Sequence, residues 1–385
     1  MYKVKCYDKI AACGLKLFDG DFEITENTED ADAALVRSSS LQETEMPEGM
    51  LAIARAGAGV NNIPVDKLTG KGVVVFNTPG ANANGVKELV IAALLLSSRD
   101  IIEGVNWVKT IDSDVGKSVE KGKKAFAGKE IYGKKLGVIG LGAIGVLVAN
   151  SAISLGMTVY GFDTYLSVEH ALALKNNINI VKNINKIFEE CDYITVHVPL
   201  LPDTKYMFNK QAFSKMKKGV CILNFSRDQL VNDDDMLEAI SSGKVRRYIT
   251  DFPDEKTKNA EGIIAIPHLG ASTEESEDNC AVMAVKEIMK YVRTGEITNS
   301  VNFPDTDAGA LSGGYRITIL HKNVPNMIGQ FAALLGNDKI NIANMINKSK
   351  GDSAYTVIDT ETDPTHMVKD LADIDNVYKV RIIAG

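Results

Sequence analysis

The sequence predicts an α/β protein with a doubly wound parallel sheet and a small antiparallel domain at the C-terminus. From Lys134 onward, apolar strand-like runs alternate with helical segments, which is the pattern of βαβ crossovers in a parallel sheet covered on both faces. A Gly-, Pro-, Asp- and Ser-containing stretch at residues 298–314 then interrupts the periodicity and predicts a linker. After it, the order strand, helix, strand, strand, helix, strand is that of ferredoxin-like domains. At 385 residues, the chain is long enough for two or three domains.

The predicted elements follow in chain order. Near the N-terminus, ADAALVRSS (31–39) and VVVF (73–76) are candidate strands, and a long helix begins near Gly85. The central strands are LGVIG, TVYGF, YITVH, VCILN and RRYIT. A helix with apolar residues at roughly helical spacing follows at residues 274–292. In the last part, YRITIL, INIANMIN, SAYTVIDT and YKVRII are strands, and PNMIGQFAALLG and DPTHMVKDLADI are helices.

Composition and charge exclude several function classes. A formal net charge of −7 argues against non-specific nucleic-acid binding, which needs a basic surface. The five cysteines are scattered without a C-x-x-C pair, so we expect reduced thiols and neither a disulfide framework nor a metal site. The N-terminus lacks the apolar core of a signal peptide, and the longest apolar run, VIAALLL (90–96), is too short to span a membrane. We therefore expect a soluble cytoplasmic protein.

The strongest motif is a glycine-rich turn between a strand and a helix, in residues 134–163. Gly140, Gly142 and Gly145 follow the strand LGVIG, and the next strand ends in Asp163, eighteen residues after Gly145. The glycines permit a tight turn and a close approach of the backbone to a pyrophosphate, which the free N–H groups of the helix N-terminus can bind. The carboxylate of Asp163 can accept hydrogen bonds from both ribose hydroxyls of NAD and would repel a 2′-phosphate. The motif predicts a Rossmann-like NAD site.

Three polar residues follow consecutive strands and suit the oxidation of a hydroxy acid. Arg227 can hold a carboxylate with its planar guanidinium. His268, in IPHLGASTEES, has an ordinary pKa near neutrality and can take the hydroxyl proton. Glu255 lies after the strand between them, and a carboxylate near an imidazole raises the imidazole pKa and fixes its tautomer. We expect the three side chains to meet at the carboxyl edge of the sheet.

Several segments of the sequence resemble those of the D-isomer-specific 2-hydroxyacid dehydrogenases. The resemblance is carried by RAGAGVNNI, NTPGANANGVKEL, GVIGLGAIG, HVPLLPDT, MKKGVCILNFSR and IPHLGAST, and it covers nearly the whole chain. It implies a discontinuous architecture in which residues 1–88 and 280–297 form a flavodoxin-like substrate-binding domain and residues 89–279 the NAD-binding domain. Residues 298–314 would be the linker and residues 315–385 a regulatory domain. RAGAG together with PHLGAST is specific for the branch that acts on 3-phospho-D-glycerate.

The resemblance also assigns site residues. It makes Arg227, Glu255 and His268 the catalytic trio. It places the substrate on Arg55, Ala56, Gly57, Ala58, Arg227 and His268. It places NAD beside Thr78, Gly140, Gly142, Ala143, Ile144, Gly145, Asp163, His197, Val198, Pro199, Thr204, Phe225, Ser226, Arg227, Asp251, His268, Gly270 and Ala271.

Some positions depart from the family pattern. Asp228 stands where the family usually has glycine, and Lys256 where it usually has proline. The segment between Glu255 and His268 is shorter than in most relatives. The family's aspartate near the nicotinamide amide matches either Thr250 or Asp251, and Asp251 is favoured because threonine carries no charge.

The last domain resembles an ACT domain, a small regulatory module of amino-acid biosynthetic enzymes. The resemblance lies in HKNVPNMIGQFAALLGNDKINIANM (321–345). It implies that L-serine binds between two such domains at His321 and Asn323, expected in the turn before the first helix, and at Asn341, which begins the second strand. The alternative to effector binding is a structural role, in which Asn323 caps a helix and Asn341 suits a turn. Edge-to-edge pairing of these domains would make the protein a homodimer or homotetramer.

The predicted function is NAD-dependent oxidation of 3-phospho-D-glycerate to 3-phosphohydroxypyruvate, the first step of L-serine biosynthesis, with feedback inhibition by L-serine. Arg55 or the lysines between Lys117 and Lys135 are candidates for holding the substrate phosphate. One alternative is another activity of the family, such as reduction of glyoxylate or hydroxypyruvate or oxidation of D-lactate. A second is an NAD-sensing, protein-binding module in which turnover is incidental. Neither metal, membrane nor nucleic acid is expected as a partner.

Overall fold

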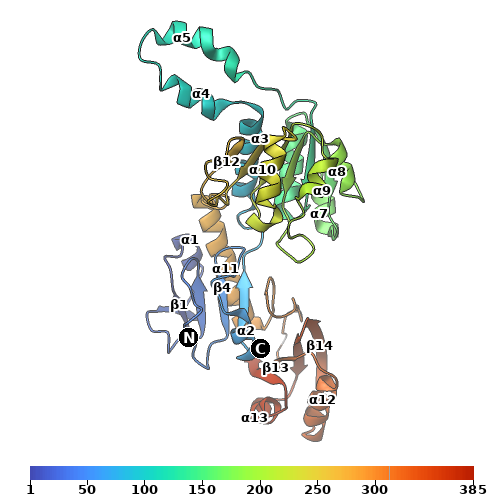
Figure 1. Cartoon of the computed structure of the whole chain (residues 1–385). Helices are drawn as coiled ribbons and strands as arrows, with labels where there is room; N and C mark the ends of the chain where they lie inside the picture. The colour runs from blue at the N-terminus through green and yellow to red at the C-terminus, as the bar shows by residue number, and fades with distance from the viewer. Residues whose placement is uncertain (312) are drawn as a thin grey trace. The chain divides into compact units, whose positions relative to one another are not determined.

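The computed structural model describes residues 1–311 and 313–385, which form two compact units. One unit comprises Met1–Asn82 with Glu274–Gly385, and the other comprises Ala83–Thr273 (Figure 1). The chain thus passes between the units after Asn82 and after Thr273, earlier than the predicted boundaries at 88 and 279. The reason is that α3 (Ala83–Ser98) and α11 (Glu274–Thr294) are continuous helices, which the predicted boundaries would cut.

The first unit contains a five-stranded parallel sheet in the order β2-β1-β3-β4-β5. Its strands are β1 (Tyr2–Cys6), β2 (Phe22–Thr25), β3 (Ala33–Val36), β4 (Ala52–Arg55) and β5 (Val74–Asn77), with short helices α1 (Ala12–Leu15) and α2 (Val65–Gly70). Helix α11 packs against this sheet through Ala284, Ile288 and Tyr291. Gly14 of α1 lies so close to α11 that a Cβ there would fall 2.7 Å from the backbone of Ala281. The small residue is what lets the two helices touch.

Residues 297–306 pack against this sheet, although they were predicted as part of a linker. Asn302 is the clamp: its Oδ1 accepts from the Val75 N–H at 2.9 Å, and its Nδ2 donates to the Val73 carbonyl at 2.9 Å. Ser300 forms an antiparallel bridge with Phe76. The polar residues of this segment therefore form hydrogen bonds with the edge strand β5 and the residue before it. Residue 312 of the predicted linker lies outside the described residues.

The C-terminal part of this unit is an antiparallel sheet of four strands in the order β14-β15-β13-β16. Its elements are β13 (Tyr315–Lys322), α12 (Met327–Asn337), β14 (Ile342–Lys350), β15 (Ser353–Thr360), the 3-10 helix η3 (Thr365–Met367), α13 (Val368–Ala372) and β16 (Val377–Ala384). The two middle strands of the sheet are the first and third in sequence, which confirms the ferredoxin-like arrangement. Ile317, Ile319 and Phe331 belong to the core between the sheet and its helices.

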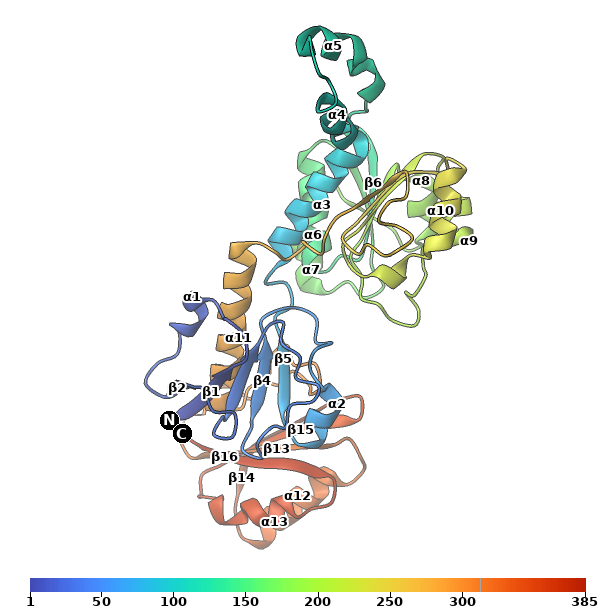
Figure 2. The same ribbon diagram turned by 60° about the vertical axis from the view of Figure 1, so that its left-hand side comes forward.

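Residues on the other face of this sheet dock on the C-terminal end of α11. The Tyr355 hydroxyl donates to the Gly295 carbonyl at 2.6 Å. The Arg381 guanidinium donates to the Tyr291 carbonyl at 2.7 Å and lies 4.8 Å from the centre of the Tyr291 ring. Arg316, fully buried, pairs with Asp359 at 2.7 Å. Both sheets of the unit thus share one core around α11, as the close placement of β13, β15 and β5 in Figure 2 shows.

The second unit is a seven-stranded parallel sheet in the order β12-β11-β10-β9-β6-β7-β8. The strands are β6 (Lys135–Ile139), β7 (Thr158–Phe162), β8 (Asn179–Ile180), β9 (Tyr193–Val196), β10 (Val220–Asn224), β11 (Val245–Thr250) and β12 (Ile263–Ala265). The covering helices are α3, α6 (Ala143–Ser154), α7 (Val168–Ala173), α8 (Asn185–Glu190), α9 (Lys210–Lys215) and α10 (Asp233–Ser241). The strand order reverses at β6, which is the switch point of a Rossmann-like fold.

Within this unit, α4 (Ile101–Val108), α5 (Val115–Gly122) and the short 3-10 helix η1 (Lys123–Phe126) form an arm that lies apart from the sheet (Figures 1 and 2). None of the arm's residues is buried. Within the arm, Trp107 packs against Phe126 with 5.2 Å between ring centres, and Glu103 of α4 joins the arm to β11 through an ion pair with Arg247 at 2.6 Å. No helix within residues 1–311 or 313–385 combines the length and apolarity that a membrane crossing requires.

Candidate active site

The glycine-rich turn lies at the carboxyl end of β6, where the strand order reverses. Gly140 has a φ of +90°, and a Cβ there would fall 2.4 Å from the His197 carbonyl oxygen. Gly142 precedes α6, whose first residues are the predicted NAD neighbours Ala143 and Ile144. A Cβ on Gly145 would lie 1.8 Å from the Gly140 carbonyl oxygen, so only glycine lets α6 approach the strand. The backbone thus leaves the first turn of α6 open to an anion.

Asp163 at the end of β7 is held beside this turn. Its Oδ2 accepts from the Leu141 N–H at 2.7 Å, and its Oδ1 accepts from the Tyr165 N–H at 2.7 Å. A carboxylate has about four acceptor positions, so each oxygen keeps one for a ligand hydroxyl. This geometry fits the ribose of NAD, and the negative charge is unfavourable for a 2′-phosphate.

The loop HVPLLPDT after β9 starts with a histidine that stays neutral. The backbone N–H of His197 donates to the Ile139 carbonyl at 2.7 Å, and its Nε2 lies 3.0 Å from the Thr195 hydroxyl. Burial lowers the pKa of His197 to about 3. Further along, the Thr204 hydroxyl donates to the Pro199 carbonyl at 2.7 Å and closes the loop that also contains Val198. These contacts fix the loop beside the glycine turn and exclude His197 as an acid–base catalyst.

Arg227 follows β10 in a loop that Asn224 and Ser226 hold in place. Asn224 Nδ2 donates to the Arg227 carbonyl at 2.8 Å, and the Ser226 hydroxyl donates to the Val196 carbonyl at 2.7 Å. Phe225 packs into the core beneath the loop. The Arg227 guanidinium is exposed and can bind an anionic ligand. Sequence reasoning did not single out Asn224, although a polar residue at the end of an apolar strand is a usable signal.

Asp251, after β11, is the carboxylate that interacts with His268. Only 1% of Asp251 is exposed. Its Oδ2 accepts from the Gly270 N–H at 3.1 Å, and its Oδ1 has no hydrogen-bond partner within the part of the chain that the structure describes. Burial raises the pKa of Asp251, and the positive charges of His268 and Arg227 act in the opposite direction. The structure therefore brings Arg227, Asp251 and His268 into one electrostatic cluster.

Thr250 and Asp251, the two candidates for the nicotinamide neighbour, differ in what they offer. The Thr250 hydroxyl accepts from the Phe252 N–H at 3.1 Å within its own turn. The open Oδ1 of Asp251 can accept from an amide N–H of a ligand. The Phe252 ring in turn lies 4.7 Å from the His268 imidazole, between ring centres, and supports one side of it. The surroundings thus favour Asp251, in agreement with the charge argument.

The position of Glu255 does not support its predicted contact with His268. The Glu255 side chain is 90% exposed and forms an ion pair with Lys258, three residues further on. The turn that contains it is closed by Asp254, whose Oδ1 accepts from the Thr257 N–H at 2.7 Å. The short segment between Glu255 and His268 forms this local turn, which keeps the carboxylate in solvent.

Four of the predicted substrate residues, 55–58, belong to the other unit. Arg55 ends β4, where its Nε donates to the Arg37 carbonyl at 3.0 Å and its Nη1 donates to the Gly59 carbonyl. Ala56, Gly57 and Ala58 follow in a turn, and they are buried, half-buried and exposed, in that order. Thr78, a predicted NAD neighbour, is fully buried, and its N–H donates to the Gly57 carbonyl at 3.1 Å. The Arg55 side chain therefore fixes the shape of this loop.

The predicted effector residues are in the C-terminal domain, and His321 does not lie in a turn. It is within β13, 2% exposed, with Nδ1 2.8 Å from the Lys322 carbonyl and Nε2 2.9 Å from the Thr356 hydroxyl. Burial lowers the pKa of His321. Asn323 is exposed but donates to the Gly351 carbonyl at 3.0 Å, and Asn341 is exposed just before β14. The alternation of polar and apolar residues along YRITILHK concealed that both faces of β13 are buried.

Comparison with known proteins gives the family. Residues 91–271 match the NAD binding domain of the D-isomer specific 2-hydroxyacid dehydrogenases. The chain is 35% identical over 292 residues to D-3-phosphoglycerate dehydrogenase of Methanocaldococcus jannaschii, covering 74% of this chain and 54% of that protein. It is 30% identical over 383 residues to D-3-phosphoglycerate dehydrogenase of Haemophilus influenzae, covering 96% of this chain and 90% of that protein.

A solved structure gives the same result. The chain resembles NAD+-bound 3-phosphoglycerate dehydrogenase of Entamoeba histolytica with a TM-score of 0.62 and 26% identity. The match covers 78% of this chain and 98% of that one. Together with the glycine turn and Asp163, these matches place the NAD site in the Ala83–Thr273 unit. The chain belongs to the D-isomer specific 2-hydroxyacid dehydrogenase family and is an NAD-dependent oxidoreductase.

Proposed function

We propose that this protein oxidises 3-phospho-D-glycerate to 3-phosphohydroxypyruvate with NAD, the first step of L-serine biosynthesis. The observation that carries the proposal is the cluster of Arg227, Asp251 and His268 at the carboxyl edge of the sheet that holds the glycine turn. The choice of substrate within the family rests on the likeness to the Haemophilus influenzae enzyme, which extends over 96% of this chain. The chain spans about half of the Methanocaldococcus jannaschii enzyme, so that relative supports the substrate less directly.

The residues divide the chemistry as follows. NAD, when bound, accepts the hydride from the carbon that carries the hydroxyl group. Arg227 binds the substrate carboxylate with paired hydrogen bonds and orients that carbon. His268 takes the hydroxyl proton, and Asp251 offsets the positive charge that the imidazole acquires. The open Oδ1 of Asp251 would accept a hydrogen bond from the nicotinamide amide of bound NAD. The phosphate is assigned to basic residues among Arg55 and the lysines of the arm and the segment after it.

The first experiment is the initial rate of NADH formation with 3-phospho-D-glycerate at mildly alkaline pH, with the product trapped. We expect saturable turnover that requires NAD and is at least tenfold slower with NADP, since Asp163 opposes a 2′-phosphate. D-lactate oxidation and the reduction of glyoxylate and hydroxypyruvate are measured alongside. If glyoxylate or hydroxypyruvate is reduced while phosphoglycerate gives no turnover, the substrate assignment is wrong and the alternative activity replaces it.

We further propose that the C-terminal domain is an ACT domain that responds to L-serine. Its strand order and its sequence likeness support the domain type. The site would use Asn323 and Asn341, since both nitrogens of His321 are engaged inside the sheet. In the same rate assay, millimolar L-serine is expected to suppress turnover, and a double Asn323→Ala, Asn341→Ala variant is expected to lose most of that sensitivity with its uninhibited rate unchanged. A wild-type rate indifferent to serine would remove the effector from the proposal and leave the enzyme.

Self-association is the remaining part of the proposal, and the arm supports it. Helices α4 and α5 present apolar side chains to solvent: Ile101, Val105, Val108 and Val115 are 42–49% exposed. Ile101, Val105 and Val108 line a pocket of about 520 Å³ together with Trp107 and Phe126. Short helices without a buried face are marginal in water, so a partner surface is needed to stabilise them. A second copy of the chain fits because the exposed surface is apolar and each arm can cover the other.

A charge placed on the arm should therefore separate the subunits. We expect wild type to have the mass of a dimer or tetramer at micromolar concentration, and Val105→Asp combined with Val108→Asp to form smaller species. Size-exclusion chromatography with light scattering measures both. Val168→Asp, at another exposed valine of the same unit, is the matched control and should keep the wild-type mass. A monomeric wild type, or an arm variant with unchanged mass, would contradict the assignment of the arm.

A further inference from the structure

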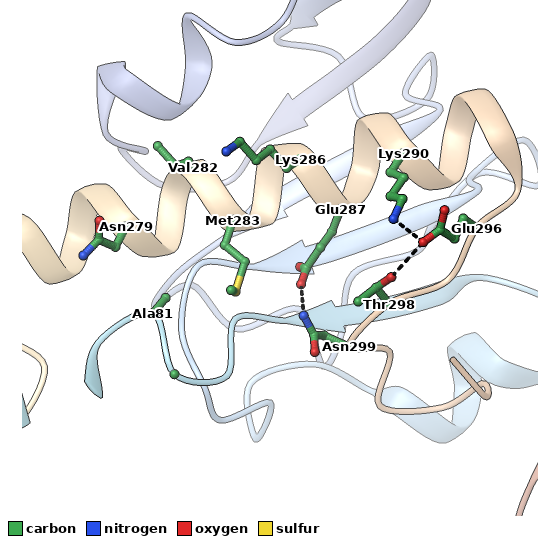
Figure 3. Close-up of a pocket in the computed structure, with 11 residues that line it drawn as sticks. Ala81, Asn279, Val282, Met283, Lys286, Glu287, Lys290, Glu296, Thr298 and Asn299 are labelled. Atoms are coloured by element: carbon green, nitrogen blue, oxygen red, sulfur yellow. Dashed lines mark hydrogen bonds and ion pairs between the residues drawn. The ribbon is translucent and has the colours of Figure 1, made fainter. Parts of the chain in front are cut away.

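A pocket in the Met1–Asn82, Glu274–Gly385 unit is separate from all residues to which a role has been given above. Its volume is about 480 Å³, which lies within the range of small-molecule sites. It lies between one face of α11 and two loops, as Figure 3 shows. The residues that line it are Gly80, Ala81, Asn279, Val282, Met283, Lys286, Glu287, Lys290, Glu296, Thr298 and Asn299.

Glu287 is the unusual member of this set. It is 7% exposed, and Asn299 Nδ2 donates to its Oε1 at 2.8 Å. Its Oε2 has no hydrogen-bond partner among residues 1–311 and 313–385. Burial raises the pKa of Glu287 to about 8; the negative charge of Asp305 acts in the same direction, and the bond from Asn299 opposes it. A buried carboxyl with one satisfied oxygen is a costly group that an incoming hydrogen-bond donor would stabilise.

Neither lysine of the pocket forms an ion pair with Glu287 in the part of the chain that the structure describes. Lys290 forms an ion pair with Glu296, whose carboxylate also accepts from the Thr298 hydroxyl at 3.5 Å. In Figure 3 this pair lies beyond Glu287 along α11, toward its C-terminal end. Lys286 lies at the exposed side of the helix. Ala81, Val282 and Met283 provide an apolar surface on the other side of Glu287.

We propose that this pocket binds a small organic molecule that carries a primary ammonium group on an apolar body. The ammonium donates to Oε2 of Glu287, and the body covers Met283 and Ala81. A charge-assisted bond to a desolvated carboxylate is stronger than a neutral one, which gives the ammonium its preference over a hydroxyl. The inference does not depend on the proposed catalytic function, because it concerns binding to a different part of the chain.

The place of the pocket in the chain suggests what an occupant would do. Gly80 and Ala81 lie immediately before the passage to the second unit after Asn82, and α11 begins directly after the return passage at Glu274. A molecule in the pocket therefore contacts the residues that lead into the first passage and the helix that follows the second. Such a molecule would be an effector, and the reacting groups remain those of the other unit.

The test is calorimetric titration of the full chain with n-pentylamine at pH 6.5, with 1-pentanol as the uncharged probe of the same length. We expect one amine to bind per chain and pentanol to bind at least tenfold more weakly. Glu287→Gln, which keeps the shape and removes the charge, is expected to weaken amine binding at least tenfold. Glu275→Gln, an exposed glutamate on the same helix, is the matched control and should bind like wild type.

Proton release provides a second readout on the unaltered protein. Glu287 is protonated in the free protein at pH 6.5, so binding an ammonium should release up to one proton, and release should vanish by pH 9.5. Titrations in two buffers of different ionisation enthalpy measure it. Lys286, Lys290, Glu296 and Asp305 are the charged groups near Glu287. Equal binding of amine and pentanol, unchanged binding by Glu287→Gln, or no proton release at pH 6.5 would each overturn the proposal.

Discussion

Replacing His268 with asparagine is expected to lower kcat for the oxidation of 3-phospho-D-glycerate by about 10²–10⁴-fold, the usual contribution of a positioned acid–base group. Asparagine keeps a polar side chain of similar reach but cannot take the hydroxyl proton. The glycine turn and Asp163 are untouched, so affinity for NADH, measured by its fluorescence, should change less than threefold. Steady-state kinetics at saturating NAD gives kcat.

The control for this substitution is His170→Asn. His170 is a half-buried histidine on α7 of the same unit, and its replacement should leave kcat within twofold of wild type. If His268→Asn retained more than half of the wild-type kcat with NAD binding intact, His268 would not be the base. The neutral, buried His197 could not replace it, since its pKa of about 3 keeps it from carrying a proton.

The second large effect concerns the carboxylate that serves His268. Asp251→Asn is expected to lower kcat/KM by about 10²-fold, roughly 2.7 kcal/mol of transition-state stabilisation. Glu255→Gln is expected to change it less than threefold, because the Glu255 side chain is 90% exposed and paired with Lys258. The two variants make the same chemical change at positions four residues apart, so each is the control for the other. If Glu255→Gln lowered kcat/KM more than Asp251→Asn does, the family-derived role of Glu255 would hold, and the Glu255–Lys258 pair would have to open during turnover.

Much of the fold could be predicted because its signals are local. The apolar runs of β6, β7, β9, β10 and β11 and the glycine turn lie in consecutive sequence, and the strand order confirms the Rossmann-like sheet. The ferredoxin-like order of the last domain could be predicted for the same reason. Gly140 and Gly145 were recognisable since their backbone positions tolerate no side chain.

What could not be predicted depends on contacts between distant residues. The side-chain environments of Asp251 and Glu255 are set by Gly270 and by a turn closed at Thr257, and neither neighbour is visible from strand spacing. The same holds for His321, whose burial results from pairing with β15 and from packing against Phe331 of α12. The hydrogen bonds of Asn302 are also long-range, because Asn302 and Val75 are 227 positions apart in the sequence. Polar composition alone predicts a loop around Asn302.

The docking of the C-terminal sheet on α11 has a consequence for how this protein can be divided. Tyr355, Leu320 and Val357 of the C-terminal sheet belong to the same core as Tyr291 of α11 and Phe76 of the first sheet. A truncation after the first sheet would expose that apolar surface and leave the carbonyls of Tyr291 and Gly295 without their donors. The C-terminal domain is therefore not a detachable accessory that could be exchanged between enzymes at residue 314. It completes the core of the unit. Chimeras should therefore be divided after β5 and before α11, so that the whole Met1–Asn82, Glu274–Gly385 unit is kept together.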